Sequence, residues 1–374
     1  MPRARNCRYP TDWPEDLQAA WIAACRPGSL LRQTGVAARW SEPTKMHVTR
    51  GIGTFLYWLQ ESGLADPPVT FADLVTPPHV MAYAAARRAQ GRDATVRTQL
   101  VGFFRGMTVM VPDRDWSWIR RLIASIPEGR AASRQRKQPR LRHSLELLEL
   151  GVQLTQRAET ATTLIPLRRA ILFRNGTMIA LLALRPIRRK NAVALVIGRH
   201  ITWTAEGWRL ILPAAEVKNR EAYDHRVPAE VGALLDRYVA VHRPILLAAG
   251  NGRMGSGSAP YLWVTQYGTL PTPEGFAQII SNETAKAFGK PVPPHFFRDS
   301  AMTSWAMDLP KQVCGGKHLL GNRSFAVVES AYNMAGSSDA ATKLQQTIAA
   351  LRKDTNGRRK APRLTQIRHQ KRHP

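Results

Sequence analysis

Residues 129–143, GRAASRQRKQPRLRH, constrain the fold of this chain more than any other stretch. They hold six cations, few apolar residues and a proline. This composition is typical of a linker, because so much charge would be costly to pack against protein. We therefore expect two domains, one on each side, and 374 residues are enough for two separate cores.

Positive charge dominates the whole sequence. Lys and Arg total 54 against 27 Asp and Glu, which gives a formal charge of +27 and a pI near 11.1. Such an excess would repel itself in a compact fold unless a polyanion is the usual partner. Nucleic acid is the first candidate, and the linker cations are expected to contact its backbone and add salt-dependent, sequence-independent affinity. These cations are Arg130, Arg134, Arg136, Lys137, Arg140 and Arg142; a merely solvated segment is the alternative.

Membrane and metal chemistry find little support in the sequence. The longest apolar run, MIALLAL before Arg185, is far shorter than the roughly 18 residues that span a bilayer. The N-terminus has no apolar core of a signal peptide. Cys7, Cys25 and Cys314 lie far apart, without the spacing of metal ligands. We expect a cytoplasmic, nucleoid-associated protein with no membrane partner, no disulfide framework, no zinc and no cofactor.

Hydrophobic periodicity predicts the organisation on each side of the linker. Five helical segments punctuated by Pro and Gly fill the first part, at 14–27, 43–63, 77–91, 94–112 and 115–127. They predict an all-helical domain over 1–128. In the second part, helical segments at 144–159 and 166–184 give way to period two, with a hairpin across Glu206-Gly207 and a second hairpin-like segment over 214–230. Helices then return, so 144–351 is predicted to be an α+β domain, followed by a basic tail over 352–374.

Five residues of the second domain carry groups that a phosphoryl-transfer site would use. Arg188 follows a predicted helix, and Lys218 lies in the strand region. His295 and Arg298 are one turn apart and share a helix face, so both can point at one phosphate. Tyr332 lies between two helical segments. No carboxylate pair, Gly-rich nucleotide loop or Cys/His cluster has the spacing of a metal-dependent nuclease.

These residues, in this order, resemble the tyrosine recombinase family, the phage-type integrases. Arg188 is followed by Leu195 seven residues later, as in the first arginine box of the family. VKNREAYDHRVP resembles the setting of the hairpin lysine, and PHFFRDS matches the His-x-x-Arg box. LLGNRSFAVVESAYNMA resembles the Leu-Gly-His box, with Tyr332 ten residues after Asn322. The resemblance covers nearly the whole chain.

Two positions depart from the family pattern. Asn322 stands where the family has His or, at times, Trp, and Asn191 stands where it commonly has Glu. We interpret Asn191 as a lesser change, at a position that supports packing. Asn322 keeps an N–H donor but cannot titrate, which predicts a slower enzyme rather than an inactive one.

The resemblance implies a fold, a mechanism and partners. The fold is an N-terminal all-helical core-binding domain and a mainly helical catalytic domain with a small antiparallel sheet, the DNA breaking-rejoining fold. Tyr332 would be the nucleophile that forms a 3′-phosphotyrosyl intermediate, without metal or ATP. Arg188, Arg298, His295 and Asn322 would contact the phosphate, and Lys218 would protonate the leaving 5′ oxygen. Double-stranded DNA, a tetramer in the synapse and accessory DNA-bending or directionality proteins are the implied partners.

Several alternatives stay open at this point. The chain could be a catalytically weakened or inactive DNA-binding member of the family, for which Asn322 is the motif-level support. An RNA-binding or ribosome-associated protein explains the charge but not the four boxes. The stripe Leu344, Ile348 and Leu351 could pack on its own domain or dock onto a neighbouring protomer. No pattern in the sequence identifies the DNA target site. Nor does any pattern distinguish integration from excision or resolution as the biological outcome.

Overall fold

The computed structural model describes residues 6–28, 33–64, 70–129, 135–217, 220–250 and 260–308. The chain folds as two compact units, Met1–Gln135 and Arg136–Pro374, each described here by itself. The division between them falls inside the segment 129–143. No helix within the described ranges is long and apolar enough to cross a membrane.

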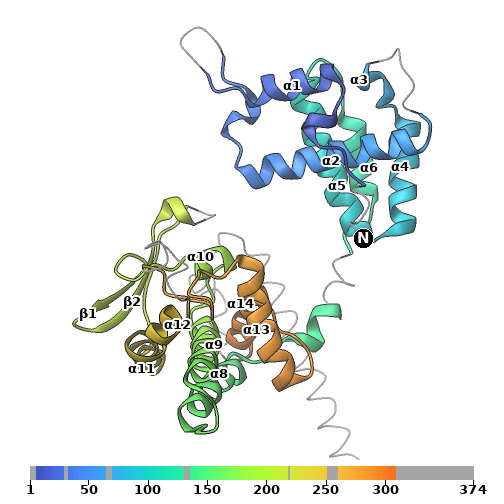
Figure 1. Cartoon of the computed structure of the whole chain (residues 1–374). Helices are drawn as coiled ribbons and strands as arrows, with labels where there is room; N and C mark the ends of the chain where they lie inside the picture. Colours follow the sequence, from blue (N-terminus) through green and yellow to red (C-terminus); the bar gives the residue numbers. More distant parts are fainter. Residues whose placement is uncertain are drawn as a thin grey trace, which may run out of the picture. The chain divides into compact units, whose positions relative to one another are not determined.

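The first unit is helical throughout its described part (Figure 1). The five predicted helices are present, with ends that differ by only a few residues, and the short helix α3 and two 3₁₀ turns were missed. The elements are η1 (Pro10–Asp12), α1 (Glu15–Cys25), η2 (Val36–Arg39), α2 (Glu42–Glu61), α3 (Phe71–Leu74), α4 (Pro77–Gln90), α5 (Asp93–Met110) and α6 (Ser117–Ser125).

An aromatic cluster and a close helix crossing build the core of the first unit. Phe55 of α2 lies 5.3 Å from the Tyr83 ring and 4.7 Å from the Phe103 ring. Helices α2 and α5 approach backbone to backbone, since a Cβ on Gly51 would lie 2.4 Å from the amide nitrogen of Phe103. A side chain in place of Gly51 would therefore push the two helices apart.

The second unit is mainly helical and carries a small sheet (Figure 1). Its helical elements are η3 (Gln138–Arg140), α8 (Ser144–Thr160), α9 (Pro166–Leu184), α10 (Arg189–Val193), η4 (Ala214–Glu216), α11 (Ala229–Arg237), the π-helical turn η5 (Tyr238–His242), α12 (Arg243–Ala249), α13 (Pro273–Phe288) and α14 (Pro294–Asp308). Its strands are β1 (Ile201–Thr204), β2 (Gly207–Leu212) and β3 (Tyr223–Arg226), antiparallel in the order β1-β2-β3. The α+β prediction for this part is confirmed.

The sheet differs in detail from the two hairpins that we expected. Thr204 pairs with Gly207, so the first turn is made by Ala205 and Glu206, and Gly207 opens β2 with φ +100°. The segment 214–230 contributes one strand rather than a hairpin of its own. That strand, β3, pairs with β2 so that Leu212 lies opposite Tyr223. Period two identifies a strand but does not identify its partner, which is why this expectation was wrong.

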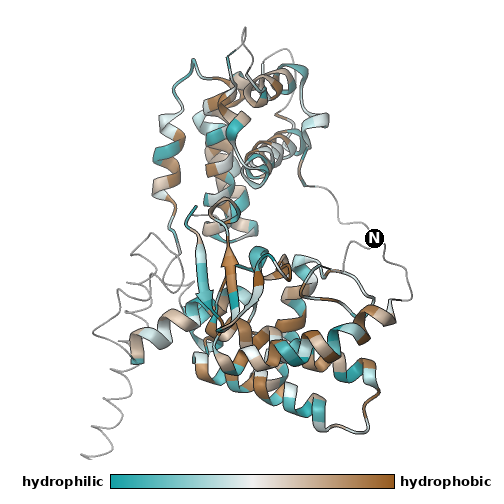
Figure 2. Cartoon of the chain, turned by 90° about the vertical axis from the view of Figure 1, so that its left-hand side faces the viewer, coloured by the Kyte–Doolittle hydropathy of each residue, from teal (hydrophilic) through white to brown (hydrophobic). Residues whose placement is uncertain are grey.

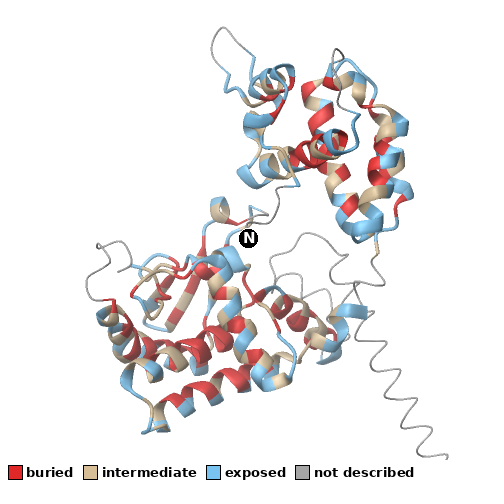
Figure 3. Ribbon diagram, turned by 45° about the vertical axis from the view of Figure 1, so that its right-hand side comes forward, coloured by how far each residue is buried: buried red, intermediate tan, exposed pale blue. Residues whose placement is uncertain are grey.

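Helix α9 is the centre of the second unit. It is buried nearly all round from Phe173 to Ala183, and Figure 3 shows such buried residues gathered inside each unit. Helix α8 lies directly against it, because a Cβ on Gly151 would come within 2.7 Å of the Ala180 amide nitrogen. Figure 2 shows hydrophobic and hydrophilic residues alternating along the helices, as in surface helices, and α9 contributes many of the residues in the buried apolar cluster of the second unit.

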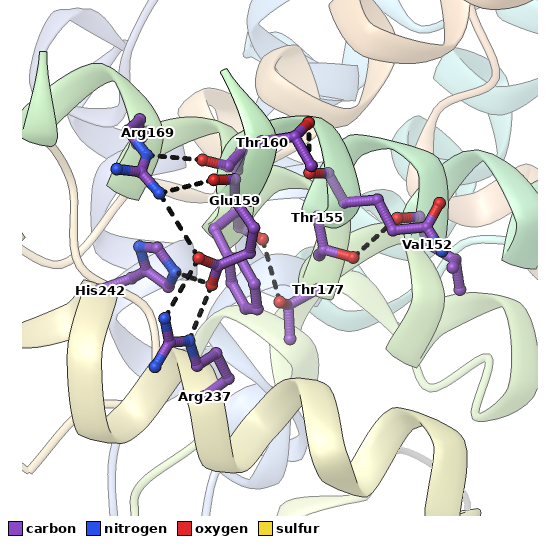
Figure 4. Close-up of polar contacts among 11 residues, drawn as sticks. Val152, Thr155, Glu159, Thr160, Arg169, Thr177, Arg237 and His242 are labelled. Carbon is purple, nitrogen blue, oxygen red and sulfur yellow. Dashed lines mark hydrogen bonds and ion pairs between the residues drawn. The ribbon is translucent and has the colours of Figure 1, made fainter. Parts of the chain in front are cut away.

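A polar cluster closes one end of the α8–α9 pair (Figure 4). The Glu159 carboxylate accepts hydrogen bonds from Arg237 Nε at 2.8 Å and from His242 Nε2 at 2.9 Å. Arg169 Nε donates to Ala158 O at 2.7 Å. The hydrogen bond from Arg237 is the main cause that lowers the pKa of Glu159 to about 2. The cluster joins α8, α9, α11 and η5 through one carboxylate.

The second half of the segment 129–143 packs on the second unit, which corrects our expectation that its charge would keep it off protein. Lys137 Nζ lies 2.8 Å from Asp299 Oδ2, and Arg140 Nε donates to Pro291 O at 2.9 Å. The Arg142 guanidinium lies 5.2 Å from the centre of the Phe288 ring. Composition shows how many cations the segment has. It does not show the backbone carbonyls, the carboxylate and the aromatic rings elsewhere in the chain with which these cations interact. We call residues 137–144 the basic strap; it runs against α14.

Candidate phosphate-binding site

A small pocket in the second unit brings together residues from distant parts of the sequence. It is lined by Ile187, Arg188, Asn191, Leu212, Val217, Glu221, Tyr223 and Arg298. Two of the predicted site residues, Arg188 and Arg298, are therefore in one pocket. Glu221 is the acidic residue among those that line it, against two arginines.

Arg188 is positioned by the end of α9. Pro186 cannot continue a helix, and the chain turns tightly there, since the Ile187 amide donates to Arg185 O at 2.7 Å. Arg188 follows as the N-cap residue of α10, with φ −65° and ψ 142°. The Arg185 guanidinium donates from Nε and Nη2 to Arg226 O, at 2.9 and 2.5 Å. This contact fixes the segment 185–188 to the end of β3.

Arg298 reaches the pocket from α14 and is held by the same segment. Its Nη1 donates to Pro186 O at 2.6 Å. Burial, helped by the nearby Arg188 charge, lowers the pKa of Arg298 to about 10, so the group is still a cation at neutral pH. Two cations held beside each other are stabilised by an anion between them, and a phosphate offers the oxygens that guanidinium groups bind best.

The chain on either side of Lys218 borders this pocket. Val217 lines it, and the Arg220 amide donates to Val217 O at 2.9 Å. Arg220 has φ +55°, a left-handed conformation that is uncommon for a residue with a side chain. Asn191 Nδ2 donates to Glu216 O at 3.3 Å, which links α10 to the segment that leads into position 218. Lys218 itself lies outside the described residues, so its role stays a prediction.

His295 lies one turn before Arg298 on α14 but is not among the residues that line the pocket. The side chain is exposed, and its ring contacts the Phe296 ring at 4.7 Å. Partial burial is the main cause that lowers the pKa of His295. Asp299 acts on this pKa in the opposite direction, whereas Lys137, Arg140 and Arg189 act in the same direction as burial. His295 is therefore mainly neutral at pH 7 and can both donate and accept a hydrogen bond.

The remaining predicted site residues divide into two groups. Asn322, Tyr332, the stripe from Leu344 to Leu351 and the basic tail lie outside the described residues, as do Arg130 and Arg134. Arg136 is exposed, whereas Lys137, Arg140 and Arg142 are engaged with α14 and the end of α13. In the part of the chain that the structure describes, no group of three His, Cys, Asp or Glu side chains could hold a metal ion.

Tyr223 is the pocket residue that the sequence reasoning missed. It opens β3, is 7 % exposed, and its hydroxyl makes no hydrogen bond within the described residues. Burial raises the pKa of Tyr223 to about 12, although the Arg185 and Arg298 charges act in the opposite direction. The signal was in VKNREAYDHRVP, where alternation places this tyrosine on the buried face a few residues after Lys218.

Comparisons with known proteins show which solved structures share this fold. No family model matches the sequence, and no curated protein matches it. Solved structures do match. The XerH site-specific recombinase bound to palindromic difH substrate, a post-cleavage complex, has a TM-score of 0.54 and 13 % sequence identity over 80 % of this chain and 79 % of that one. The XerH pre-cleavage complex with difH has a TM-score of 0.53 and 13 % identity over 79 % and 78 %.

These similarities extend over both units of the chain and show its fold. The chain has the fold of a site-specific recombinase of the XerH type. This confirms the fold class that the resemblance to tyrosine recombinases implied, a helical domain followed by a mainly helical domain with a small antiparallel sheet.

Proposed function

We propose that this protein is a site-specific DNA recombinase that cuts and rejoins DNA through a covalent 3′-phosphotyrosyl intermediate on Tyr332. The observation that carries the proposal is the pocket in which Arg188 and Arg298 meet, since Arg298 binds Pro186 O across 112 positions of sequence. The two sequence boxes that were read separately thus converge on one small site. The fold shared with XerH, whose structures hold difH DNA, supports the same proposal.

The chemistry follows from the groups that the chain provides. A phenol with pKa near 10 is about one-thousandth ionised at pH 7, a handicap of roughly 4 kcal/mol. Arg188 and Arg298 lower that barrier by binding the non-bridging oxygens as negative charge grows on them. His295, neutral at pH 7, is suited to donate to the same oxygens or to pass on the tyrosine proton. Lys218 protonates the 5′ oxygen as it leaves, and the phosphotyrosyl bond keeps the energy for rejoining.

Double-stranded DNA is the proposed partner, and mobile-element integration or excision the proposed role. Arg130, Arg134 and Arg136 are the linker cations that we propose contact the DNA backbone. Lys137, Arg140 and Arg142 contribute their charge while they hold the strap to α14. A tetramer on two DNA sites and accessory directionality proteins belong to the same proposal, together with the domain limits 1–128, 129–143, 144–351 and 352–374.

Relaxation of supercoiled plasmid in EDTA tests the proposal without knowledge of the target site. We expect the wild-type chain to relax plasmid and to become covalently linked to a DNA 3′ end at low salt. Tyr332→Phe is expected to bind the same DNA with unchanged affinity and to do neither. A covalent product that persists in Tyr332→Phe would refute the proposed nucleophile.

A catalytically weakened DNA-binding protein is the second candidate, and Asn322 is the observation that favours it. The replaced donor could cost about 1–3 kcal/mol of transition-state stabilisation. We expect Asn322→His to raise the rate of covalent product formation by about 5- to 100-fold. If neither chain forms that product on any DNA, while both bind DNA tightly, the weakened protein is the better description.

A further inference from the structure

A buried hydroxyl in the candidate site makes no hydrogen bond with the residues that the structure describes. Tyr223 Oη has no such partner and almost no exposed surface, and the side chain lines the same pocket as Arg188 and Arg298. A buried hydroxyl without a hydrogen-bond partner destabilises the folded chain relative to a phenylalanine at the same position. Unsatisfied groups of this kind are rare in folded proteins and often belong to functional positions.

Tyr223 comes to the pocket from the sheet, and Arg298 lies near enough to act on the pKa of its hydroxyl. Tyr223 lies opposite Leu212 on the buried face of β2 and β3, and both residues line the pocket. The other end of β3 is held by Arg185, whose Nε donates to Arg226 O. Tyr223 therefore reaches the site from a regular strand, whereas Arg188 comes from a helix N-cap and Arg298 from a helix.

Resting on the function proposed above, we infer that Tyr223 is a further phosphate-binding residue, whose hydroxyl donates to a non-bridging oxygen of the scissile phosphate held by Arg188 and Arg298. Guanidinium groups and a neutral phenol hydroxyl are all donors that a phosphate oxygen can accept from. A phosphate diester has two non-bridging oxygens with enough lone pairs for all three donors.

The environment of Tyr223 fits a donor and not a second nucleophile. Burial raises the pKa of its hydroxyl to about 12, so the proton stays on the oxygen at any physiological pH. A hydroxyl of this kind supplies one neutral hydrogen bond to a charged oxygen, with no proton to transfer. Glu221, which also lines the pocket, is the group that opposes anion binding there.

Two tyrosine-to-phenylalanine variants separate this role from simple packing. Tyr223→Phe removes a hydroxyl that has no partner among the described residues, so the chain should be as stable as the wild type or more stable. Its covalent product on plasmid should nevertheless form about 10- to 100-fold more slowly, the value of one hydrogen bond to a charged oxygen. Tyr238→Phe is the matched control: Tyr238 is fully buried in the same unit, outside the pocket, and its hydroxyl accepts from the Val264 amide. That variant should lose stability and keep the cleavage rate.

A second measurement does not depend on cleavage. The chain has eight tyrosines, so ring-labelled tyrosine gives a short NMR spectrum in which the two variants assign Tyr223 and Tyr238. Titration with inorganic phosphate should shift the Tyr223 signal and leave Tyr238 unmoved, and Arg298→Ala should abolish the shift. A Tyr223 signal that phosphate does not move overturns the inference, as does a Tyr223→Phe rate within about twofold of the wild type. A wild-type chain that forms no covalent product refutes the recombinase proposal alone, and the phosphate titration then decides the role of Tyr223.

Discussion

The two units of this chain bury different kinds of side chain. Within the described part of the first unit, Thr54 is the one polar residue that is buried, and its hydroxyl bonds Tyr83 Oη at 2.8 Å. The second unit buries a larger polar set. Its members are Thr155, Arg174, Asn175, Thr177, His200, His242, Arg243, Thr284, Ser300 and Ser304.

Buried charge destabilises a fold unless it is paired, so the buried arginines of the second unit need hydrogen-bond partners. Arg174 illustrates how: its Nη1 donates to Val264 O at 2.8 Å, and its Nε and Nη2 donate to Asn175 Oδ1. Asn175 in turn donates to Glu283 of α13 at 2.9 Å. Apolar packing holds both units, and the second unit adds directed contacts between its helices, as a site with aligned groups requires.

The largest expected effect is a cavity in the first unit. Phe55→Ala removes the ring at the centre of the aromatic cluster and should destabilise that unit by about 4 kcal/mol. Hydrogen exchange of α2 and α5 measures it, with Ile22→Ala as the control, because Ile22 is 61 % exposed on α1. Exchange in α9 should not change. A loss of protection that spreads equally through both units would break the comparison.

The next effect is on activity and concerns the second unit. Arg298→Lys keeps the charge but loses the planar fork and its contact with Pro186 O. We expect covalent product formation to fall by about 100-fold, with DNA affinity unchanged, in the plasmid assay. Arg209→Lys is the matched control, since Arg209 pairs with Asp224 on the exposed side of the sheet. A loss in Arg298→Lys no larger than the loss in Arg209→Lys would show that the planar guanidinium in the pocket does not govern cleavage.

Sequence alone predicted what depends on local signals. Proline and glycine residues at the segment ends predicted the helices of the first unit. Alternation of apolar and polar residues predicted the strands of the second unit. The sequence boxes singled out Arg188 and Arg298, and the structure brings both into one pocket although they are far apart in sequence. Their role in binding a phosphate stays a prediction. The positions of Lys218, Asn322 and Tyr332 remain predictions, since they lie outside the described residues.

What sequence missed depends on tertiary partners. The strap was interpreted as a free linker because its cations were visible while Asp299, Pro291 O and Phe288 were far away in sequence. Tyr223 was overlooked because an inward aromatic residue on a strand is ordinary, and only the folded structure shows that its hydroxyl has no partner among the described residues. Whether a polar group has a hydrogen-bond partner depends on the folded chain, so the hydrophobic periodicity of the sequence cannot reveal it.

Acid should lower the stability of the second unit by protonating Glu159. Its folded pKa of about 2 lies below the ordinary value of 4.5, so its stabilising effect is full above pH 4.5 and disappears as pH falls toward 2. Because the side chain is 31 % exposed, we expect a loss of only about 1–2 kcal/mol. Denaturant unfolding between pH 5 and 2 measures this loss, which Glu159→Gln should flatten. Glu149→Gln, exposed on the same helix, should leave the slope as it is.

The smallest expected effect concerns glycines with positive φ at helix ends, which occur in both units. Gly63 follows α2 with φ +65° and Gly289 follows α13 with φ +72°, and a Cβ at either position would meet nothing within 4 Å. The cost of alanine there is therefore that of the left-handed backbone alone, about 1 kcal/mol in each unit. Hydrogen exchange of the preceding helix turn measures it.

Gly91→Ala is the control for this pair, because Gly91 ends α4 in extended conformation with φ −156°. Alanine adopts that conformation freely, so the substitution should cost nothing and can even stabilise α4 by restricting the unfolded chain. Equal losses at Gly63 and Gly289 would show that helix ends follow the same backbone rule in both units. The difference between the units would then rest on their buried polar groups. A much larger loss at Gly289 would instead place part of that difference in the backbone that leads from α13 to α14, the helix that carries Arg298.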